Sequence, residues 1–180
     1  MLDKDTALDL WKRACDLPSG EFVKGLPLEL IQVECNGVGA VWMGNVHILG
    51  SNRTLLDIAN GICEWALPAT VRHDIRYTIG GTSEQRREDD LIFLDDCQWL
   101  ANQLYKAEHW YNPMRYIRFV RRHREAYQMY LFLRAFGHHA YRFNNAADAE
   151  NEEWISGERA ALVGAEYRPA KAVAGDSTPQ

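Results

Sequence analysis

Residues 68–85 constrain the fold most, because they mark the start of one helix, its end and the start of the next. The proline that opens this stretch suits the first turn of a helix that runs to about Ile79. Gly80-Gly81 then matches a helix end that needs a left-handed residue. Thr82 and Gln85 have the spacing of a capping box, which begins a second helix. Two helices joined by so short a connection tend to pack antiparallel.

Further helices are predicted on both sides of this stretch. Asp3 or Asp5 can cap a first helix, which ends in the turn-rich residues 17–20. Asn112-Pro113 is a second cap-plus-proline start, and the helix after it runs to about Phe136. The sequence therefore predicts a mainly α-helical chain.

The remaining segments are less regular. Residues 28–34 alternate in part and fit a short strand or a buried helical turn. Residues 36–39 are expected to form an irregular loop, and residues 40–49 a small hairpin or an extended loop. The helix that opens at Thr82 is expected to bury one apolar stripe, formed by Leu91, Leu94, Cys97 or Gln98, Ala101 and Leu104.

Composition indicates one folded domain and a tail. The chain has 180 residues, 47% of them hydrophobic, and six Trp, which suits one globular domain over residues 1–143. Residues 144–180 turn acidic and then polar, and we expect about the last 15 of them to be disordered. The net charge of −5 disfavours a nucleic-acid partner.

The four cysteines favour a reducing compartment. Cys15, Cys35, Cys63 and Cys97 are scattered, without a CxxC pair or metal-ligand spacing. The first residues do not form a secretory signal, and no apolar run approaches the ~20 residues of a membrane-spanning helix. We therefore expect a soluble cytoplasmic protein, or one associated with a virion, with reduced thiols.

The candidate chemistry centres on His73, Asp74 and Tyr77. On a helix, His73 and Tyr77 share one face one turn apart, and Asp74 is rotated by about 100°. Asp90 lies early in the next helix, so antiparallel packing can bring it back beside His73 and Tyr77. A His with an Asp behind it can act as a general base.

A cation is the second element of this chemistry. Asp74 alone is a poor calcium site, since calcium takes six to eight oxygens. The Asn36-Gly37-Val38-Gly39 loop can supply backbone carbonyls, because glycines let successive carbonyls turn toward one centre. Calcium held there would polarise an ester carbonyl and stabilise its oxyanion. A plain tight turn is the alternative for this loop.

These motifs together resemble a known family. An Asn-Gly-x-Gly loop, His-Asp-x-x-Tyr-x-x-Gly-Gly-Thr and an Asp-x-x-Phe helix look like a phage- and bacteria-type protein family with the phospholipase A2 fold. The resemblance covers roughly residues 34–143. It implies a core of two long antiparallel helices, a short calcium-loop or β-containing segment before them, and a disordered C-terminal tail.

The resemblance also implies an activity and a set of roles. The activity is calcium-dependent hydrolysis of a phospholipid acyl ester at a membrane surface. His73 would be the water-activating base, and Asp90 and Tyr77 its hydrogen-bonded supports, with Asp89 as the second choice for Asp90. The implied calcium ligands are Asn36, Gly37, Gly39 and Asp74. Relatives typically carry a Cys pair where this chain has Val38 and Thr70, so the loop is less constrained here.

An Arg-rich helix leaves a second class of function open. Five arginines, interleaved with aromatic residues, occupy residues 115–124. They can form a cationic face for phosphate headgroups or nucleic acid, or a solvated face paired with the acidic residues Glu84, Glu88, Asp89 and Asp95. The competing function is therefore a non-enzymatic, phage- or prophage-derived binding or virion component that keeps the helical scaffold.

Overall fold

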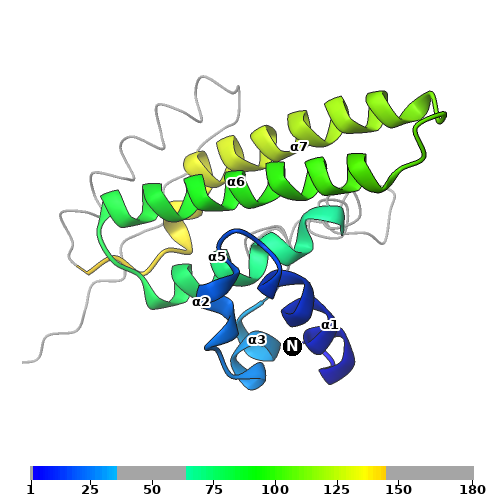
Figure 1. The fold of residues 1–180 in the computed structure, drawn as a ribbon. Helices are drawn as coiled ribbons and strands as arrows, with labels where there is room; N and C mark the ends of the chain where they lie inside the picture. The colour runs from blue at the N-terminus through cyan, green and yellow to red at the C-terminus, as the bar shows by residue number, and fades with distance from the viewer. Residues whose placement is uncertain (1, 36–63, 145–180) are drawn as a thin grey trace, which may run out of the picture.

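The computed structural model describes residues 2–35 and 64–144, and in these ranges the chain is mainly helical and has no strand (Figure 1). The elements in chain order are α1 (Lys4–Cys15), α2 (Gly20–Lys24), α3 (Leu28–Glu34), η2 (Glu64–Ala66), α5 (Leu67–Ile79), α6 (Ser83–Ala107), α7 (Met114–Phe136) and η3 (Gly137–His139). The prediction of a mainly α-helical chain is confirmed.

The first helix, α1, begins at a side-chain cap. The Asp3 carboxylate accepts hydrogen bonds from the backbone N–H groups of Asp5 and Thr6 at 3.1 and 2.9 Å, so Asp3 caps α1. The short helix α2 lies directly after the predicted break. Of the two alternatives for residues 28–34, the strand is wrong and the helix is correct, because this turn buries Ile31 completely against the core.

The junction between α5 and α6 is built as the sequence predicts. Gly80 has φ +79°, and a side chain there would collide with the backbone carbonyl of Arg142. Thr82 and Gln85 form the capping box that opens α6. Residues after η3 pack against this turn, since the Gly81 N–H donates to the Arg142 carbonyl at 2.9 Å.

Helix α6 packs antiparallel against α7. Near one end of the pair the Arg86 guanidinium donates to the Leu133 carbonyl at 2.6 Å. Near the other end the Arg115 guanidinium donates to the Tyr105 carbonyl at 2.7 Å. Helix α5 packs against α6 as well, so that α6 lies between α5 and α7 (Figure 1).

The predicted apolar stripe of α6 is partly wrong. Leu94, Cys97 and Ala101 are buried as expected, but Leu91 is 40% exposed. The buried positions of α6 also include four charged side chains, which are Arg86, Asp89, Asp90 and Asp96. Each of them has a polar partner outside α6, which removes most of the penalty of burying a charge.

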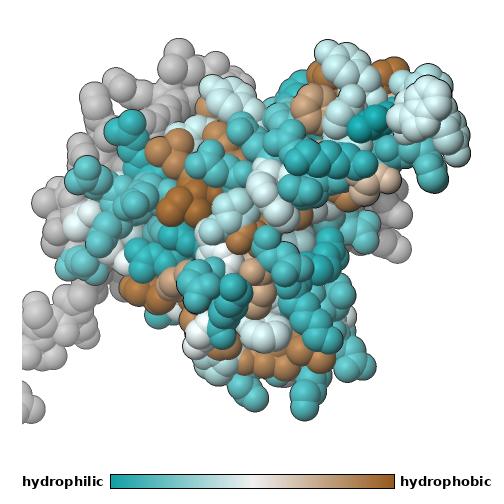
Figure 2. Space-filling model, in the orientation of Figure 1, coloured by the Kyte–Doolittle hydropathy of each residue, from teal (hydrophilic) through white to brown (hydrophobic). Residues whose placement is uncertain are grey.

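The surface carries one extended apolar stripe in its described part. Polar side chains predominate on the face drawn in Figure 2, and apolar side chains gather there in separate patches. On α7, five apolar side chains at helical spacing lie opposite the buried Ala126 and Met129, and we call them the outer face of α7. They are Tyr116, Ile117, Val120, Tyr127 and Leu131, with exposed fractions of 65%, 55%, 47%, 52% and 40%.

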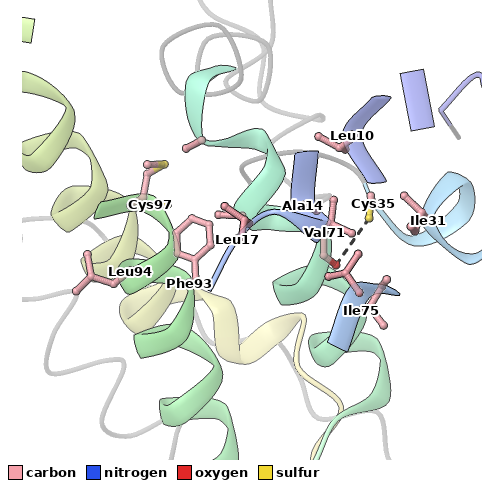
Figure 3. Packing of buried hydrophobic residues seen from close by; sticks show 14 of the residues in the cluster. Leu10, Ala14, Leu17, Ile31, Cys35, Val71, Ile75, Phe93, Leu94 and Cys97 are labelled. Atoms are coloured by element: carbon pink, nitrogen blue, oxygen red, sulfur yellow. Dashed lines mark hydrogen bonds between the residues drawn. The ribbon is translucent and has the colours of Figure 1, made fainter. Parts of the chain in front are cut away.

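The hydrophobic core joins the N-terminal helices to α5 and α6. Leu10 and Ala14 of α1 and Ile31 of α3 belong to one buried cluster with Val71 and Ile75 of α5 (Figure 3). Phe93, Leu94 and Cys97 add the apolar contribution of α6. Cys15 and Cys35 are free thiols.

Several predictions fall outside the described residues. They are the calcium loop with Asn36, Gly37 and Gly39, the hairpin at residues 40–49, Cys63, and the tail from residue 145 onward. Of the helices that the structure describes, none combines the length and the apolar composition that crossing a bilayer requires.

Candidate active site

His73 and Tyr77 lie side by side on the buried face of α5. Both side chains are almost fully buried, with 5% of each residue exposed. Their ring centroids are 4.1 Å apart, and Phe93 of α6 packs against the imidazole at 5.1 Å. The one-turn spacing seen in the sequence therefore places both side chains against α6.

Asp90 of α6 meets both residues. Its Oδ1 lies 3.1 Å from His73 Nε2 and accepts a hydrogen bond from the Tyr77 hydroxyl at 2.6 Å. Asp90 has no exposed surface. The predicted proximity of His73, Tyr77 and Asp90 is thus present in the structure, because the short Gly-Gly connection returns α6 antiparallel to α5.

Asp89, the second choice for this position, has other partners. Its carboxylate binds the guanidiniums of Arg72 and Arg76 at 3.1 and 3.0 Å. Both arginines belong to α5, so Asp89 also joins α5 to α6, but through ion pairs that do not include His73. The structure therefore assigns the contact with His73 to Asp90.

Asp74 lies at the opposite edge of the imidazole. Its Oδ1 is 3.6 Å from His73 Nδ1, which is a loose ion-pair distance, and its side chain is 15% exposed. The ring of His73 is therefore flanked by a buried carboxylate at Nε2 and a partly exposed one at Nδ1. The carboxylate at the Nδ1 edge is therefore the less buried of the two, with 15% of the Asp74 side chain exposed against 0% for Asp90.

Two arginines complete the site, and the sequence analysis did not identify them. Arg134 of α7 donates to Asp90 Oδ2 at 2.8 Å, and the Arg86 guanidinium lies 3.8 Å from the same oxygen. Arg86 precedes Asp90 by four residues on α6, a spacing that signals a helical ion pair. Arg134 follows Asp90 by 44 residues, and only the pairing of α7 with α6 brings them together.

The charges shift the proton affinities of the site. Burial lowers the pKa of His73, but the contacts and charges of Asp74 and Asp90 outweigh it, and the net pKa is raised. Burial raises the pKa of Asp90, but His73, the charge of Arg86 and the Tyr77 hydroxyl lower it below its usual value. Burial and the charge of Asp90 raise the pKa of Tyr77. Asp90 is therefore an anion, and Tyr77 remains a donor.

An anionic Asp90 fixes the role of each imidazole nitrogen. Because the carboxylate can only accept, Nε2 carries a proton that points at Asp90. In the neutral ring, Nδ1 is then the basic nitrogen, and it lies at the edge shared with Asp74. This arrangement can take a proton from a molecule that approaches Nδ1.

Asp74 is the only predicted calcium ligand among the described residues. Among residues 2–35 and 64–144, no group of three or more His, Cys, Asp or Glu side chains is placed to hold a metal ion. Asp74 is the one predicted ligand in these ranges, so most of the six to eight oxygens must come from backbone carbonyls or water. Asn36, Gly37 and Gly39 lie outside the described residues.

The chain that leads into the predicted loop lies against α5. The Cys35 thiol contacts the Val71 carbonyl at 3.9 Å, and the Glu34 carboxylate accepts a hydrogen bond from the Thr78 hydroxyl at 2.8 Å. The same hydroxyl contacts the Asp74 carbonyl at 3.1 Å. Residues 34 and 35, the last described ones before the predicted loop, therefore lie against α5 at Thr78 and Val71.

The arginines of α7 pair with partners other than the predicted ones. Arg118 and Arg122 bind Glu108 at 2.6 and 3.0 Å, and Arg121 binds Glu125 at 3.2 Å. These three arginines are thus ion-paired, but the acidic partners come from the end of α6 and from α7 itself, and the Arg122 side chain is only 14% exposed.

Comparisons with protein-family models, with curated proteins and with solved structures gave no match to this chain.

Proposed function

We propose that the chain is a calcium-dependent phospholipid acyl-ester hydrolase of the phospholipase A2 type. The observation that carries the proposal is the position of His73 between Asp90 at Nε2 and Asp74 at Nδ1. A base that works on water needs one nitrogen held by a carboxylate and the other directed to the reactants. The resemblance of the ordered motifs to that family supports the same reaction.

In the proposed reaction, the residues of this chain would have the following roles. A water molecule at the Nδ1 edge gives a proton to His73, and its oxygen adds to the ester carbonyl. The ester C–O bond then breaks, and the imidazolium returns the proton to the leaving alkoxide, so that a fatty acid and an alcohol are released. Asp90 stabilises the imidazolium that forms, and the Tyr77 hydroxyl holds Asp90 Oδ1 in place. Phe93 packs against the imidazole ring with a centroid distance of 5.1 Å.

Calcium would be held by Asp74 together with carbonyls of Asn36, Gly37 and Gly39. When bound, calcium supplies positive charge to the carbonyl oxygen on which negative charge develops. The chain's own contribution is to keep Asp74 one residue away from the base, so that cation and base face the same reactant. The substrate would be presented by a phospholipid surface.

Fatty-acid release from mixed anionic and zwitterionic vesicles tests this proposal. Wild type, His73→Gln and the control His109→Gln are compared with calcium and with chelator. His109 lies on the exposed connection between α6 and α7, away from the site. We expect release that requires calcium and His73 and is unaffected by His109→Gln. Equal release from His73→Gln would refute the assigned mechanism.

A second candidate function rests on the outer face of α7. Its apolar side chains are 40–65% exposed, and a helical stripe of this kind suits docking onto a partner protein. The chain would then be a phage- or prophage-derived binding or virion component. A folded protein that releases no fatty acid, and binds no calcium by calorimetry in wild type or Asp74→Asn, would favour this candidate.

A further inference from the structure

We propose that Arg86 and Arg134 are positioning residues, which hold Asp90 as a fixed anion and thereby keep the proton of His73 on Nε2. This role adds to the proposed hydrolase mechanism. It rests on that proposal only because His73 is treated as the base. The position of the imidazole proton can be measured without any hydrolysis.

The two oxygens of Asp90 face different groups. Oδ1 contacts His73 Nε2 at 3.1 Å and the Tyr77 hydroxyl at 2.6 Å. Oδ2 contacts Arg134 at 2.8 Å and Arg86 at 3.8 Å. The arginines therefore hold the carboxylate from behind, and its rotation would break contacts on both oxygens at once.

Arg86 is itself held by groups on two other helices. Its guanidinium donates to the Leu133 carbonyl of α7 at 2.6 Å and to the Tyr77 hydroxyl of α5 at 3.3 Å. The second contact orients that hydroxyl, because Tyr77 then accepts from Arg86 and gives its own proton to Asp90. Arg86 thus acts on Asp90 both through its charge and through Tyr77.

A contribution to the stability of the fold does not explain why these charged side chains are buried. The Arg86 side chain has no exposed surface, and the Arg134 side chain is 5% exposed. Removing such groups from water offsets most of the attraction they gain, so apolar side chains of similar size stabilise a fold as well. A charge cluster is needed, however, to keep a buried carboxylate ionised beside a histidine.

The fixed anion matters for the chemistry at the opposite edge of the ring. If Asp90 turned away or took up a proton, the neutral imidazole could carry its proton on Nδ1. The basic lone pair would then point into the protein, and His73 could not accept a proton from a reactant beside Asp74. Loss of the correct tautomer is costly in comparable His-Asp sites.

The test combines a spectroscopic and a kinetic measurement on the full chain. Long-range ¹H–¹⁵N spectra of ¹⁵N-histidine protein at alkaline pH report which nitrogen of a neutral imidazole carries the proton. The spectrum of His73→Gln assigns the His73 signals. Wild type is compared with Arg134→Met, which removes the charge, and Arg134→Lys, which keeps it.

We expect the proton on Nε2 in wild type and Arg134→Lys, and a mixture of both tautomers in Arg134→Met. In the vesicle assay, kcat of Arg134→Met should fall about 10- to 100-fold. This is the loss seen when a residue that orients a metal-binding side chain is removed, and we use it here by analogy. KM should be unchanged, because Arg134 is buried behind Asp90 and does not reach the substrate.

A His73 proton on Nδ1 in wild type would overturn the proposal, as would an Arg134→Met variant that keeps the wild-type tautomer and kcat. If Arg134→Met does not fold, Arg134→Lys decides alone, since loss of the Nε2 proton despite the retained charge contradicts the proposal. An Nε2 proton in a wild type that releases no fatty acid would refute the hydrolase and leave the positioning supported.

Discussion

Replacing Asp90 by Asn should be among the most destabilising conservative changes in the described chain. The amide keeps the shape of the side chain but removes its charge. The buried guanidiniums of Arg86 and Arg134 then both lose the carboxylate that they contact at Oδ2. Removing one partner of a buried ion pair costs about 3–5 kcal/mol. Since domains of this size are stable by about 5–15 kcal/mol, the variant should fold only marginally.

Asp89→Asn provides a matched control on the same helix. Asp89 is also buried, with 2% exposed, and it pairs with Arg72 and Arg76. The side chains of these two arginines are 12% and 22% exposed, so water can partly replace the lost carboxylate. We therefore expect a loss near 2 kcal/mol for the control, which is about half of that for Asp90→Asn.

Urea unfolding followed by circular dichroism measures both losses. With an m value of about 2 kcal/mol per molar, a loss of about 4 kcal/mol moves the midpoint down by about 2 M. Equal midpoints for the two variants, or an Asp90→Asn midpoint within about 0.5 M of wild type, would contradict the reasoning. Such a result would mean that the guanidiniums at Asp90 are hydrated or reorganise when the carboxylate is lost.

Two further perturbations test the turn and the surface charges. Gly80→Ala should destabilise the fold by at least about 1 kcal/mol in the same urea assay, since φ is +79° and the new methyl group meets the Arg142 carbonyl; an unchanged midpoint would show that the turn can shift. Arg118 and then the other contacts of Glu108 lower the pKa of its carboxyl to about 2, below the unfolded value of 4.5. This pairing stabilises the fold above pH 4.5 and is lost as pH falls toward 2, so the difference in melting temperature between wild type and Glu108→Gln should shrink over that range. A difference that is constant with pH would rule out an electrostatic contribution.

Local signals in the sequence were sufficient to predict α5 and α6, the two helices that carry the site. A helix that ends at Gly80-Gly81 and restarts at the Thr82 capping box depends only on neighbouring residues, so both boundaries could be predicted. The short connection then implied antiparallel packing, and this was enough to place Asp90 beside His73 and Tyr77. The catalytic roles of these residues and the calcium loop remain predictions.

The burial pattern of α6 could not be predicted from hydrophobic periodicity. That approach treats a charged position as exposed, yet Arg86, Asp89 and Asp90 are all buried, while Leu91 is 40% exposed. A charged side chain can be buried when its partners are present, and those partners come from α5 and α7. Whether they are present is a property of the packed helices and not of the α6 sequence.

The sequence by itself determined where α1, α5, α6 and α7 begin and where α5 and α7 end, because caps, prolines and glycines act on residues within one turn. It also determined that a carboxylate, Asp74, directly follows His73 in the chain. Only the tertiary structure decided which groups surround Asp90. Arg134 reaches that carboxylate from 44 residues away, and the antiparallel register of α6 and α7 sets this contact. Contacts between distant segments depend on how whole helices pack, which a single sequence does not specify residue by residue.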